Sequence, residues 1–250
     1  MAAPAHVWIT GASSGIGAAL AALYARRGSR VTVSARSADG LAAVAGGSRL
    51  IFAAPLDVTD PEACRKTVEL VDGDAPVDLA VLAAGTYAPV EASALDPEVF
   101  AATVAVNYLG VVNSIAAVLP HMLRRGRGVI AIVASLTAYR GLPKAAAYGP
   151  TKAALNNLAE TLHAELSPHG IRVVVVNPGF VATPMTAGND FRMPFLMTPQ
   201  AAARRIAEGI DGGRFEIAFP TRLRLMLAAA RLMPDALYFR LVGRLRGKGA

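Results

Sequence analysis

The 250-residue chain has little sulfur chemistry and few charges. Its one cysteine, Cys64, excludes an intramolecular disulfide and suits a reducing compartment, so we expect a cytoplasmic protein. Charged residues make up only 17% of the sequence and hydrophobic residues 54%, which excludes general disorder and supplies a large core. The sequence has no uninterrupted apolar run of about 18 residues, and residues 1–10 lack Lys and Arg. We therefore expect neither a membrane span nor a signal peptide, and the length suits one domain.

Acidic residues are scarce at the C-terminal end. Residues 222–250 hold seven basic side chains and one acid, Asp235, so they carry +6 of the total charge of +7. No nucleic-acid-binding motif accompanies these arginines, and we expect no nucleic-acid partner. The pattern of residues 221–246 predicts two amphipathic helices divided at Pro234. We expect residues 1–220 to form the main domain and residues 221–250 to be its basic amphipathic extension.

Short apolar runs alternate with helical patterns, which is typical of βαβ units around a parallel sheet. Strands are expected at residues 6–9, 30–35, 49–53, 77–82, 129–134, 172–176 and 215–219, and helices at 16–27, 97–125, 150–166 and 198–209. Residues 177–197 contain three prolines and two glycines and predict a mobile substrate loop. The predicted fold is α/β: one Rossmann-type, doubly wound parallel sheet of about seven strands, with helices on both faces and a C-terminal helical extension.

A glycine-rich segment follows the first expected strand and enters a helix. Its glycines are Gly11, Gly15 and Gly17, spaced G-x3-G-x-G. Glycine permits a tight turn and close approach of the backbone to a pyrophosphate, while the helix N-terminus supplies N–H groups and a positive dipole. In this context the segment predicts a dinucleotide site.

The end of the second expected strand distinguishes between the two dinucleotides. An NAD site usually has an acid there to bind the ribose 2′-hydroxyl, whereas an NADP site replaces it with a cation. Here Ala35 and Arg36 stand at this point, and the next acid is Asp39. Arg36 can pair with a 2′-phosphate and stack on adenine, so NADP(H) is expected in preference to NAD(H). Asp57, after the third strand, is placed to accept a hydrogen bond from the adenine amino group, although a turn or capping residue would look the same.

Three residues later in the chain form a proton-transfer set. Tyr148 and Lys152 are four residues apart, and Ser135 precedes Tyr148 by thirteen. A free tyrosine hydroxyl has a pKa near 10, too high for efficient acid–base chemistry at neutral pH, and a lysine one helical turn away should lower it. Lys152 can also reach the ribose next to the nicotinamide. Ser135 closes the fifth expected strand, on the edge where ligands bind in doubly wound sheets, and can hold a substrate oxygen.

At these residues the chain resembles the short-chain dehydrogenase/reductase family over residues 6 to about 220. The resemblance includes Thr10-Gly11-Ala12-Ser13-Ser14-Gly15-Ile16-Gly17, Asp57, Asn107, the Ser135…Tyr148…Lys152 set and Asn177-Pro178-Gly179-Phe180-Val181-Ala182-Thr183. It implies that Tyr148 is the general acid/base, Lys152 its tuner and ribose ligand, Ser135 the group that orients the carbonyl, and Asn107 the holder of a water linked to Lys152. It also implies a set of cofactor contacts: Gly11, Ser13, Ser14, Gly15, Ile16, Gly17, Arg36, Asp57, Val58, Ala84, Gly85, Tyr148, Lys152, Pro178, Gly179, Val181 and Thr183. We expect no metal.

Two positions depart from the family pattern. The family's Asn-Asn-Ala-Gly after the fourth strand is here Leu82-Ala83-Ala84-Gly85, which removes asparagine side-chain bonds between neighbouring strands. Pro150 follows Tyr148 by two residues, where a proline can start a helix rather than break it. Neither change removes a catalytic group.

The leading hypothesis is an NADPH-dependent reductase of a ketone or aldehyde. The alternatives are an NAD-dependent alcohol dehydrogenase, an acyl-carrier-protein reductase and, remotely, a silent NADP-binding regulator or membrane scaffold. The apolar residues of the loop favour a lipophilic substrate. The resemblance implies a homodimer through helices at 97–125 and 150–166. The extension either covers the loop or a partner subunit, or it lies on the anionic inner surface of a membrane.

Overall fold

The structure, a computed structural model, describes residues 3–189, 191 and 193–246. Of residues 244–246 it describes the backbone alone. The extension's last basic residue, Lys248, lies outside the described residues. Seven parallel strands form one sheet in the order β3-β2-β1-β4-β5-β6-β7. The strands are β1 (His6–Thr10), β2 (Arg30–Ser34), β3 (Ile51–Ala53), β4 (Leu79–Leu82), β5 (Gly128–Val133), β6 (Ile171–Pro178) and β7 (Glu216–Phe219). This is the doubly wound Rossmann topology, as predicted.

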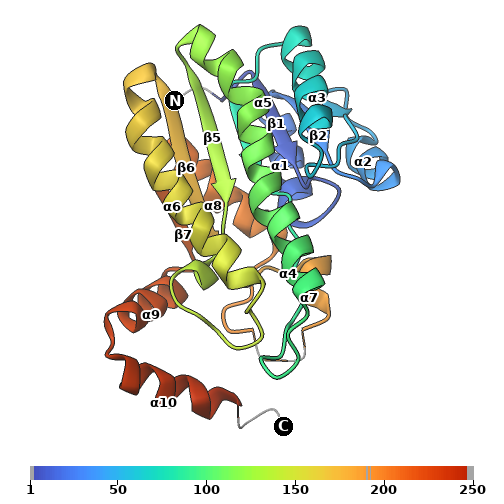
Figure 1. The fold of residues 1–250 in the computed structure, drawn as a ribbon. Coiled ribbons are helices and arrows are strands. Elements are labelled where there is room, and N and C mark those ends of the chain that lie inside the picture. Colours follow the sequence, from blue (N-terminus) through green and yellow to red (C-terminus); the bar gives the residue numbers. More distant parts are fainter. Residues whose placement is uncertain (1–2, 190, 192, 247–250) are drawn as a thin grey trace.

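Helices cover both faces of the sheet (Figure 1). One apolar cluster lies between the sheet and helices α1 (Gly15–Arg26), α2 (Ala38–Ala45) and α8 (Pro199–Asp211). A second cluster packs the other face against α3 (Pro61–Asp74), α5 (Gly110–Arg125) and α6 (Tyr148–Leu166). Strands buried on both faces explain the continuous runs of apolar and β-branched residues in the sequence.

The predicted helix at 97–125 consists of three segments. α4 (Pro97–Val104) passes into a π-helical turn, η1 (Ala105–Leu109), and then into α5. Among the described residues this 29-residue stretch is the one helix long and apolar enough to cross a bilayer, with a mean hydropathy of 1.7 in its most apolar window. Its buried residues, including Val111, Val118 and Met122, pack against the sheet. Such packing is expected of a core helix.

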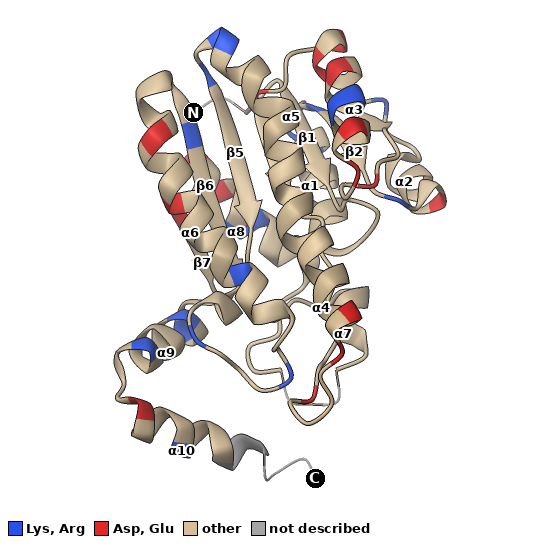
Figure 2. Ribbon diagram, viewed as in Figure 1, with Lys and Arg blue, Asp and Glu red and all other residues tan. Residues whose placement is uncertain are grey.

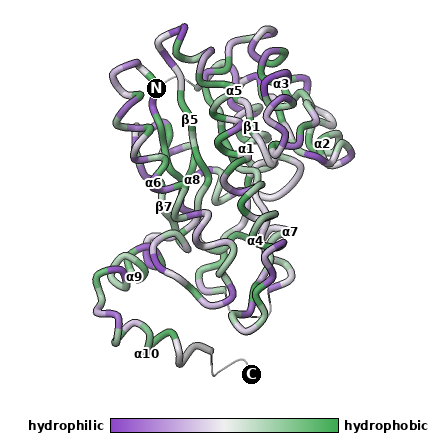
Figure 3. The backbone as a smooth tube through the Cα atoms, in the orientation of Figure 1, coloured by the Kyte–Doolittle hydropathy of each residue, from purple (hydrophilic) through white to green (hydrophobic). Residues whose placement is uncertain are grey.

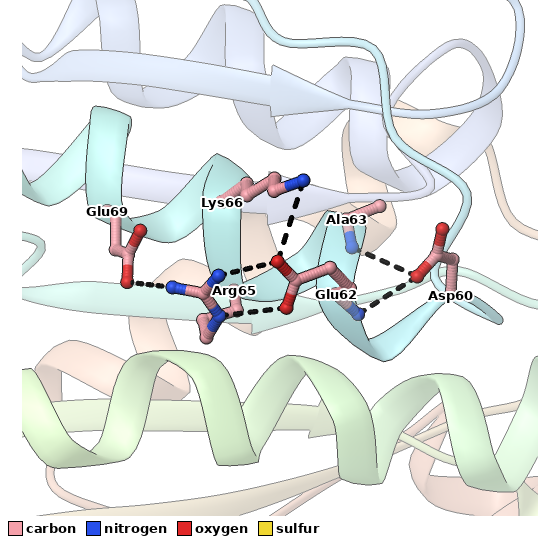
Figure 4. Close-up of polar contacts among 6 residues, drawn as sticks. All are labelled: Asp60, Glu62, Ala63, Arg65, Lys66 and Glu69. Carbon is pink, nitrogen blue, oxygen red and sulfur yellow. Dashed lines mark hydrogen bonds and ion pairs between the residues drawn. The ribbon is translucent and has the colours of Figure 1, made fainter.

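Helices α2 and α3 were not predicted from the sequence. Asp60 caps α3, because its carboxylate accepts hydrogen bonds from the backbone N–H groups of Glu62 and Ala63 at 2.9 and 3.0 Å (Figure 4). Pro61 occupies the first helical position, which suits its fixed φ angle. Arg65 bridges Glu62 and Glu69 on the exposed side. Exposed pairs of this kind stabilise a helix by only about 0.3–0.5 kcal/mol each.

The C-terminal extension forms the two predicted helices, α9 (Thr221–Leu232) and α10 (Asp235–Arg246), with Pro234 between them. They lie beyond the carboxyl ends of the strands, at the end of the molecule opposite the N-terminus (Figure 1). The predicted loop at 177–197 is partly regular: β6 continues through Asn177 and Pro178, and a short helix, α7 (Pro184–Ala187), follows. Short η2 (Leu136–Ala138) and η3 (Ser167–His169) complete the fold.

Candidate active site

The glycine loop between β1 and α1 is built from close backbone contacts. Gly11 and Gly15 have φ angles of 68° and 58°, a region that glycine adopts without strain. A Cβ atom on Gly11 would lie 2.6 Å from the carbonyl oxygen of Ala83, and one on Gly17 would lie 2.5 Å from that of Gly11. The Ser14 side chain does not cap α1. The N–H groups at the start of α1 are therefore available to bind an anion.

A cavity of about 360 Å³ opens beside this loop. Of the site residues predicted from the sequence, these line it: Gly11, Ser13, Ser14, Gly15, Ile16, Gly17, Arg36, Asp57, Val58, Ala84, Gly85, Ser135, Tyr148, Lys152, Pro178, Gly179, Val181 and Thr183. Gly11 and Thr183, which are 172 positions apart in the sequence, therefore meet at the carboxyl edge of the sheet, where doubly wound folds bind ligands.

Arg36 and Asp57 occupy one end of the cavity. Asp57 accepts hydrogen bonds from the backbone N–H and the hydroxyl of Thr59, at 2.9 and 2.8 Å. The Thr59 N–H lowers the pKa of the Asp57 carboxyl, and the Arg36 guanidinium contributes to this lowering. Ser37 also lines this end and caps α2 through Gly40 N–H. The start of α2 was not predicted, although Ser37 is a residue type that commonly caps a helix.

The proton-transfer set lies at the other end of the cavity. Tyr148 begins α6, Ser135 precedes η2, and Lys152 is one turn further along α6. The Ser135 hydroxyl is in hydrogen-bonding contact with the Tyr148 side chain. The buried Lys152 Nζ donates to the carbonyl oxygen of Val133 at 2.9 Å and lies 5.4 Å from the centre of the Tyr148 ring. Ser135 follows β5 by two residues rather than closing it, because the strand ends at Val133.

The expected lowering of the Tyr148 pKa is not what the structure gives. Burial raises the pKa of Tyr148 to about 12, and the hydrogen bond from Ser135 lowers it only in part. Burial also lowers the pKa of Lys152 to about 8. Both shifts follow from the cost of holding a charge away from water, which the sequence spacing alone did not reveal.

Asn107 is the one predicted catalytic residue that does not line the cavity. It is fully buried in the π-helical turn and binds the backbone of Thr86 in both directions: Thr86 N–H donates to Oδ1 at 2.7 Å, and Nδ2 donates to Thr86 O at 2.9 Å. A Cβ atom on the neighbouring Gly85 would lie 3.3 Å from Asn107 Oδ1 and 3.7 Å from Lys152 Nζ. Asn107 thus holds the segment beside Lys152, and π-helical turns often occur at such sites.

Thr10 binds the backbone of the segment that departs from the family pattern. Its carbonyl oxygen accepts from Ala83 N–H at 3.3 Å, and its hydroxyl accepts from Ala84 N–H at 3.4 Å. These bonds tie the end of β1 to the segment after β4. Backbone hydrogen bonds therefore hold residues 83 and 84 beside the glycine loop without asparagine side chains.

The turn after β6 lies against both the glycine loop and the extension. A Cβ atom on Gly15 would lie 3.0 Å from the Thr183 methyl group, and one on Gly179 would lie 2.9 Å from Leu223 on α9. The Thr186 hydroxyl donates to Val181 O at 2.6 Å and fixes the start of α7. Met185, one of the apolar residues of the predicted substrate loop, also lines the cavity, as does Thr186, which was not predicted.

A polar network behind Ser135 was not predicted. Asn177 Oδ1 accepts from Ser135 N–H at 3.2 Å, and Asn177 Nδ2 donates to Glu216 Oε1 at 2.8 Å. The same carboxylate accepts from the Tyr139 hydroxyl at 2.5 Å and from Arg224 at 3.2 Å. Glu216 is 77 residues from Tyr139, so no local pattern could indicate the contact. The network fixes the backbone at Ser135.

Tyr87 is a further residue at the site. Its ring meets Tyr148 edge to face, with the ring centres 5.4 Å apart. Its hydroxyl donates to Lys144 O at 3.4 Å and joins the segment after β4 to the segment before α6. No motif marked this residue.

The family model for short chain dehydrogenase matches residues 5–192. The chain belongs to the short-chain dehydrogenase family. An oxidoreductase of uncharacterized function from Myxococcus xanthus is 36% identical over 243 residues, covering 95% of this chain and 96% of that one. An Arabidopsis thaliana protein named 11-beta-hydroxysteroid dehydrogenase-like 2 is 31% identical, covering 92% and 78%.

A solved short-chain dehydrogenase from Burkholderia cenocepacia, in complex with NADP, is 27% identical and superposes with a TM-score of 0.84, covering 95% of this chain and 97% of that one. This short-chain dehydrogenase is therefore an NAD(P)-dependent oxidoreductase. Its Rossmann fold agrees with the sequence prediction.

Proposed function

We propose that this short-chain dehydrogenase reduces a lipophilic ketone or aldehyde to an alcohol, with NADPH as the preferred reductant. The observation that carries the proposal is that one cavity is lined both by Ser135, Tyr148 and Lys152, which follow β5, and by Arg36, which follows β2 further along the sheet. The glycine loop lies between them. A proton source and a dinucleotide cradle in one cavity are what carbonyl reduction requires.

The residues of the cradle fit a dinucleotide. Side chains at Gly11 or Gly17 would collide with backbone atoms, so the close approach of α1 to the loop depends on glycine. The uncapped start of α1 suits a pyrophosphate. Arg36 and Ser37 would hold the adenosine end, Asp57 the adenine amino group, and Lys152 the ribose beside the nicotinamide. When bound, the reduced cofactor supplies the hydride.

Tyr148 is the proposed proton donor. Because burial raises its pKa to about 12, the hydroxyl stays protonated at physiological pH, as a donor must. As negative charge develops on the carbonyl oxygen, the proton moves from Tyr148 Oη to that oxygen. The positive charge on Lys152 stabilises the phenolate that remains. Ser135 donates to the substrate oxygen and orients it.

The preference for NADPH rests on Arg36. It is exposed at the cavity edge, and Ala35 stands where an NAD site would have an acid. The bound NADP of the Burkholderia relative supports this preference. An NAD-dependent alcohol dehydrogenase is the alternative and would need another acceptor for the ribose 2′-hydroxyl.

Apolar side chains around the turn after β6 favour a lipophilic substrate. Met185 lines the cavity, and Phe180 and Phe191 meet edge to face with their ring centres 5.9 Å apart. The name of the Arabidopsis relative points to the same substrate class. We further propose a cytoplasmic protein, and a homodimer because Val104, Leu109 and Leu123 are exposed apolar residues on α4, η1 and α5.

A panel of carbonyl compounds, from short aldehydes to acyl and steroid ketones, tests this function. NADPH consumption should be fastest with bulky apolar ketones, and NADH should be the poorer reductant. Rapid turnover confined to acyl-carrier thioesters would favour an acyl-carrier-protein reductase. Retained NADPH binding without consumption across the whole panel would instead indicate a silent regulator.

A further inference from the structure

The extension is anchored by one arginine of the segment that joins Ser135 to Tyr148. Arg140 donates to the carbonyl oxygens of Ala230 and Met233 at 2.6 and 3.0 Å, and to the Asp235 carboxylate at 2.5 Å. Its guanidinium also lies 4.0 Å from the centre of the Tyr238 ring. These contacts join the end of α9 to the start of α10, so the two helices hold a defined position.

Two buried side chains complete this anchor. Leu223 packs on Gly179 at the base of α9, and Tyr238 is 3% exposed, with its hydroxyl donating to Gly141 O at 2.5 Å. Much of the remaining apolar surface of the extension is exposed. Its exposed large apolar residues are Leu225, Met226, Leu232, Leu237, Phe239 and Leu241. Leu232 is 88% exposed, which is unusual for a leucine fixed on an ordered helix.

Arginines alternate with these exposed leucines. Arg222, Arg231 and Arg240 are exposed on the same two helices, in a tail of seven basic residues and one acid. Figure 2 shows basic positions on α9 and α10, and Figure 3 shows hydrophobic stretches between them. A surface that is both apolar and basic complements an anionic lipid layer, where leucines enter the acyl boundary and arginines meet headgroups.

We propose that α9 and α10 form a docking surface for an anionic lipid membrane. Each helix has 12 residues, too few to span a bilayer, so they would lie in its surface. A second copy of the chain is a poorer occupant, because in a two-fold contact this basic surface would face the same basic surface of the other copy. The proposal concerns attachment and does not depend on the proposed reaction.

Sedimentation of the full-length protein with vesicles tests the proposal. The protein should pellet with phosphatidylcholine vesicles containing a quarter phosphatidylglycerol at low salt, and stay in solution with phosphatidylcholine alone. Removing two charges, as Arg231→Gln with Arg240→Gln, should weaken the partition about 25-fold, since each basic residue near the surface contributes about fivefold. High salt should weaken it as well.

Arg124→Gln with Arg127→Gln is the matched control. Both arginines are exposed at the opposite end of the molecule, around the turn before β5, and the net charge falls equally. This control should bind vesicles like the parent. Equal loss in both variants, or a parent protein that stays in solution at low salt, would overturn the proposal.

A variant that lacks two exposed leucines distinguishes lipid binding from contact with a second copy of the chain. Leu232→Ser with Leu237→Ser should lose vesicle binding and keep the parent's sedimentation coefficient without vesicles. If this variant instead breaks an oligomer into monomers while the parent ignores vesicles, the surface is a subunit interface and the proposal is wrong. Thermal melts of each variant check that the fold is retained.

Discussion

At the scale of single residues, Lys152 has a proposed catalytic role and lowers the stability of the fold. Its side chain is 3% exposed, and burial lowers its pKa from 10.5 to about 8. A shift of this size corresponds to about 3 kcal/mol of destabilisation while the amine is charged in the folded protein. The hydrogen bond to Val133 O offsets about 1 kcal/mol.

Lys152→Met should therefore stabilise the fold by about 2 kcal/mol at pH 7 while removing activity. The folded lysine gives up its proton above about pH 8, whereas the unfolded lysine keeps it until about pH 10.5, so the stability of the parent protein rises over this window. The difference between variant and parent should shrink to near zero at pH 9.5. Urea unfolding at the two pH values measures both quantities. A variant less stable than the parent at pH 7 would show that the burial cost is offset elsewhere.

Arg36 is the residue that we propose distinguishes NADPH from NADH. Arg36→Ala should weaken NADPH binding ten- to a hundredfold, because a charge-assisted contact contributes about 1.5–3 kcal/mol. NADH binding should change less than threefold. Fluorescence titration of both cofactors measures this, with Arg49→Ala as the control, an exposed arginine outside the cavity. Equal losses for NADPH and NADH would remove the argument for Arg36.

At the scale of elements, the sequence predicted the strands and most helices well because their signals are local. Buried parallel strands read as apolar runs, and Gly11, Gly15 and Gly17 marked the first strand-to-helix turn. α3 was missed because only three of its residues, Cys64, Val68 and Val71, are buried, which leaves a weak apolar pattern. The Asp60-Pro61 cap was nevertheless a usable signal.

The site was predictable where motifs carry it and unpredictable where distant segments meet. The family motifs indicated the residues that line the cavity. The contact of Glu216 with Tyr139 joins residues 77 apart, and that of Arg140 with Ala230 joins residues 90 apart. The rise in the Tyr148 pKa depends on burial. Neither can be read from spacing along the chain.

Arg140 links the end of α9 to the start of α10. Arg140→Ala removes partners from the end of α9 and from Asp235, so the segment around Pro234 should become much more sensitive to limited proteolysis. Stability should fall by about 1–3 kcal/mol. Arg140→Lys should restore little, because an ammonium cannot serve several acceptors and stack on Tyr238 at once. Proteolysis of Arg140→Ala at the parent's rate would mean that Leu223 and Tyr238 hold the extension without it.

At the scale of the whole molecule, the parallel sheet gathers the chemistry at one end. β1, β2, β4, β5 and β6 all deliver cavity residues from their carboxyl ends, and the extension lies beyond the same edge. The glycine loop, Arg36 and Tyr148 can therefore act on one bound molecule although they lie far apart in sequence. The proposed carbonyl reduction depends on Tyr148 as the proton donor within that cavity.

The most direct test compares Tyr148→Phe with the parent enzyme, using the best substrate from the carbonyl panel. The variant keeps the ring that meets Tyr87 and deletes the hydroxyl, so turnover should fall at least a thousandfold while the Kd for NADPH stays within about threefold. Turnover is followed by NADPH absorbance and cofactor affinity by fluorescence titration. A Tyr148→Phe enzyme that reduces the substrate at a near-parental rate would show that the proton comes from another group.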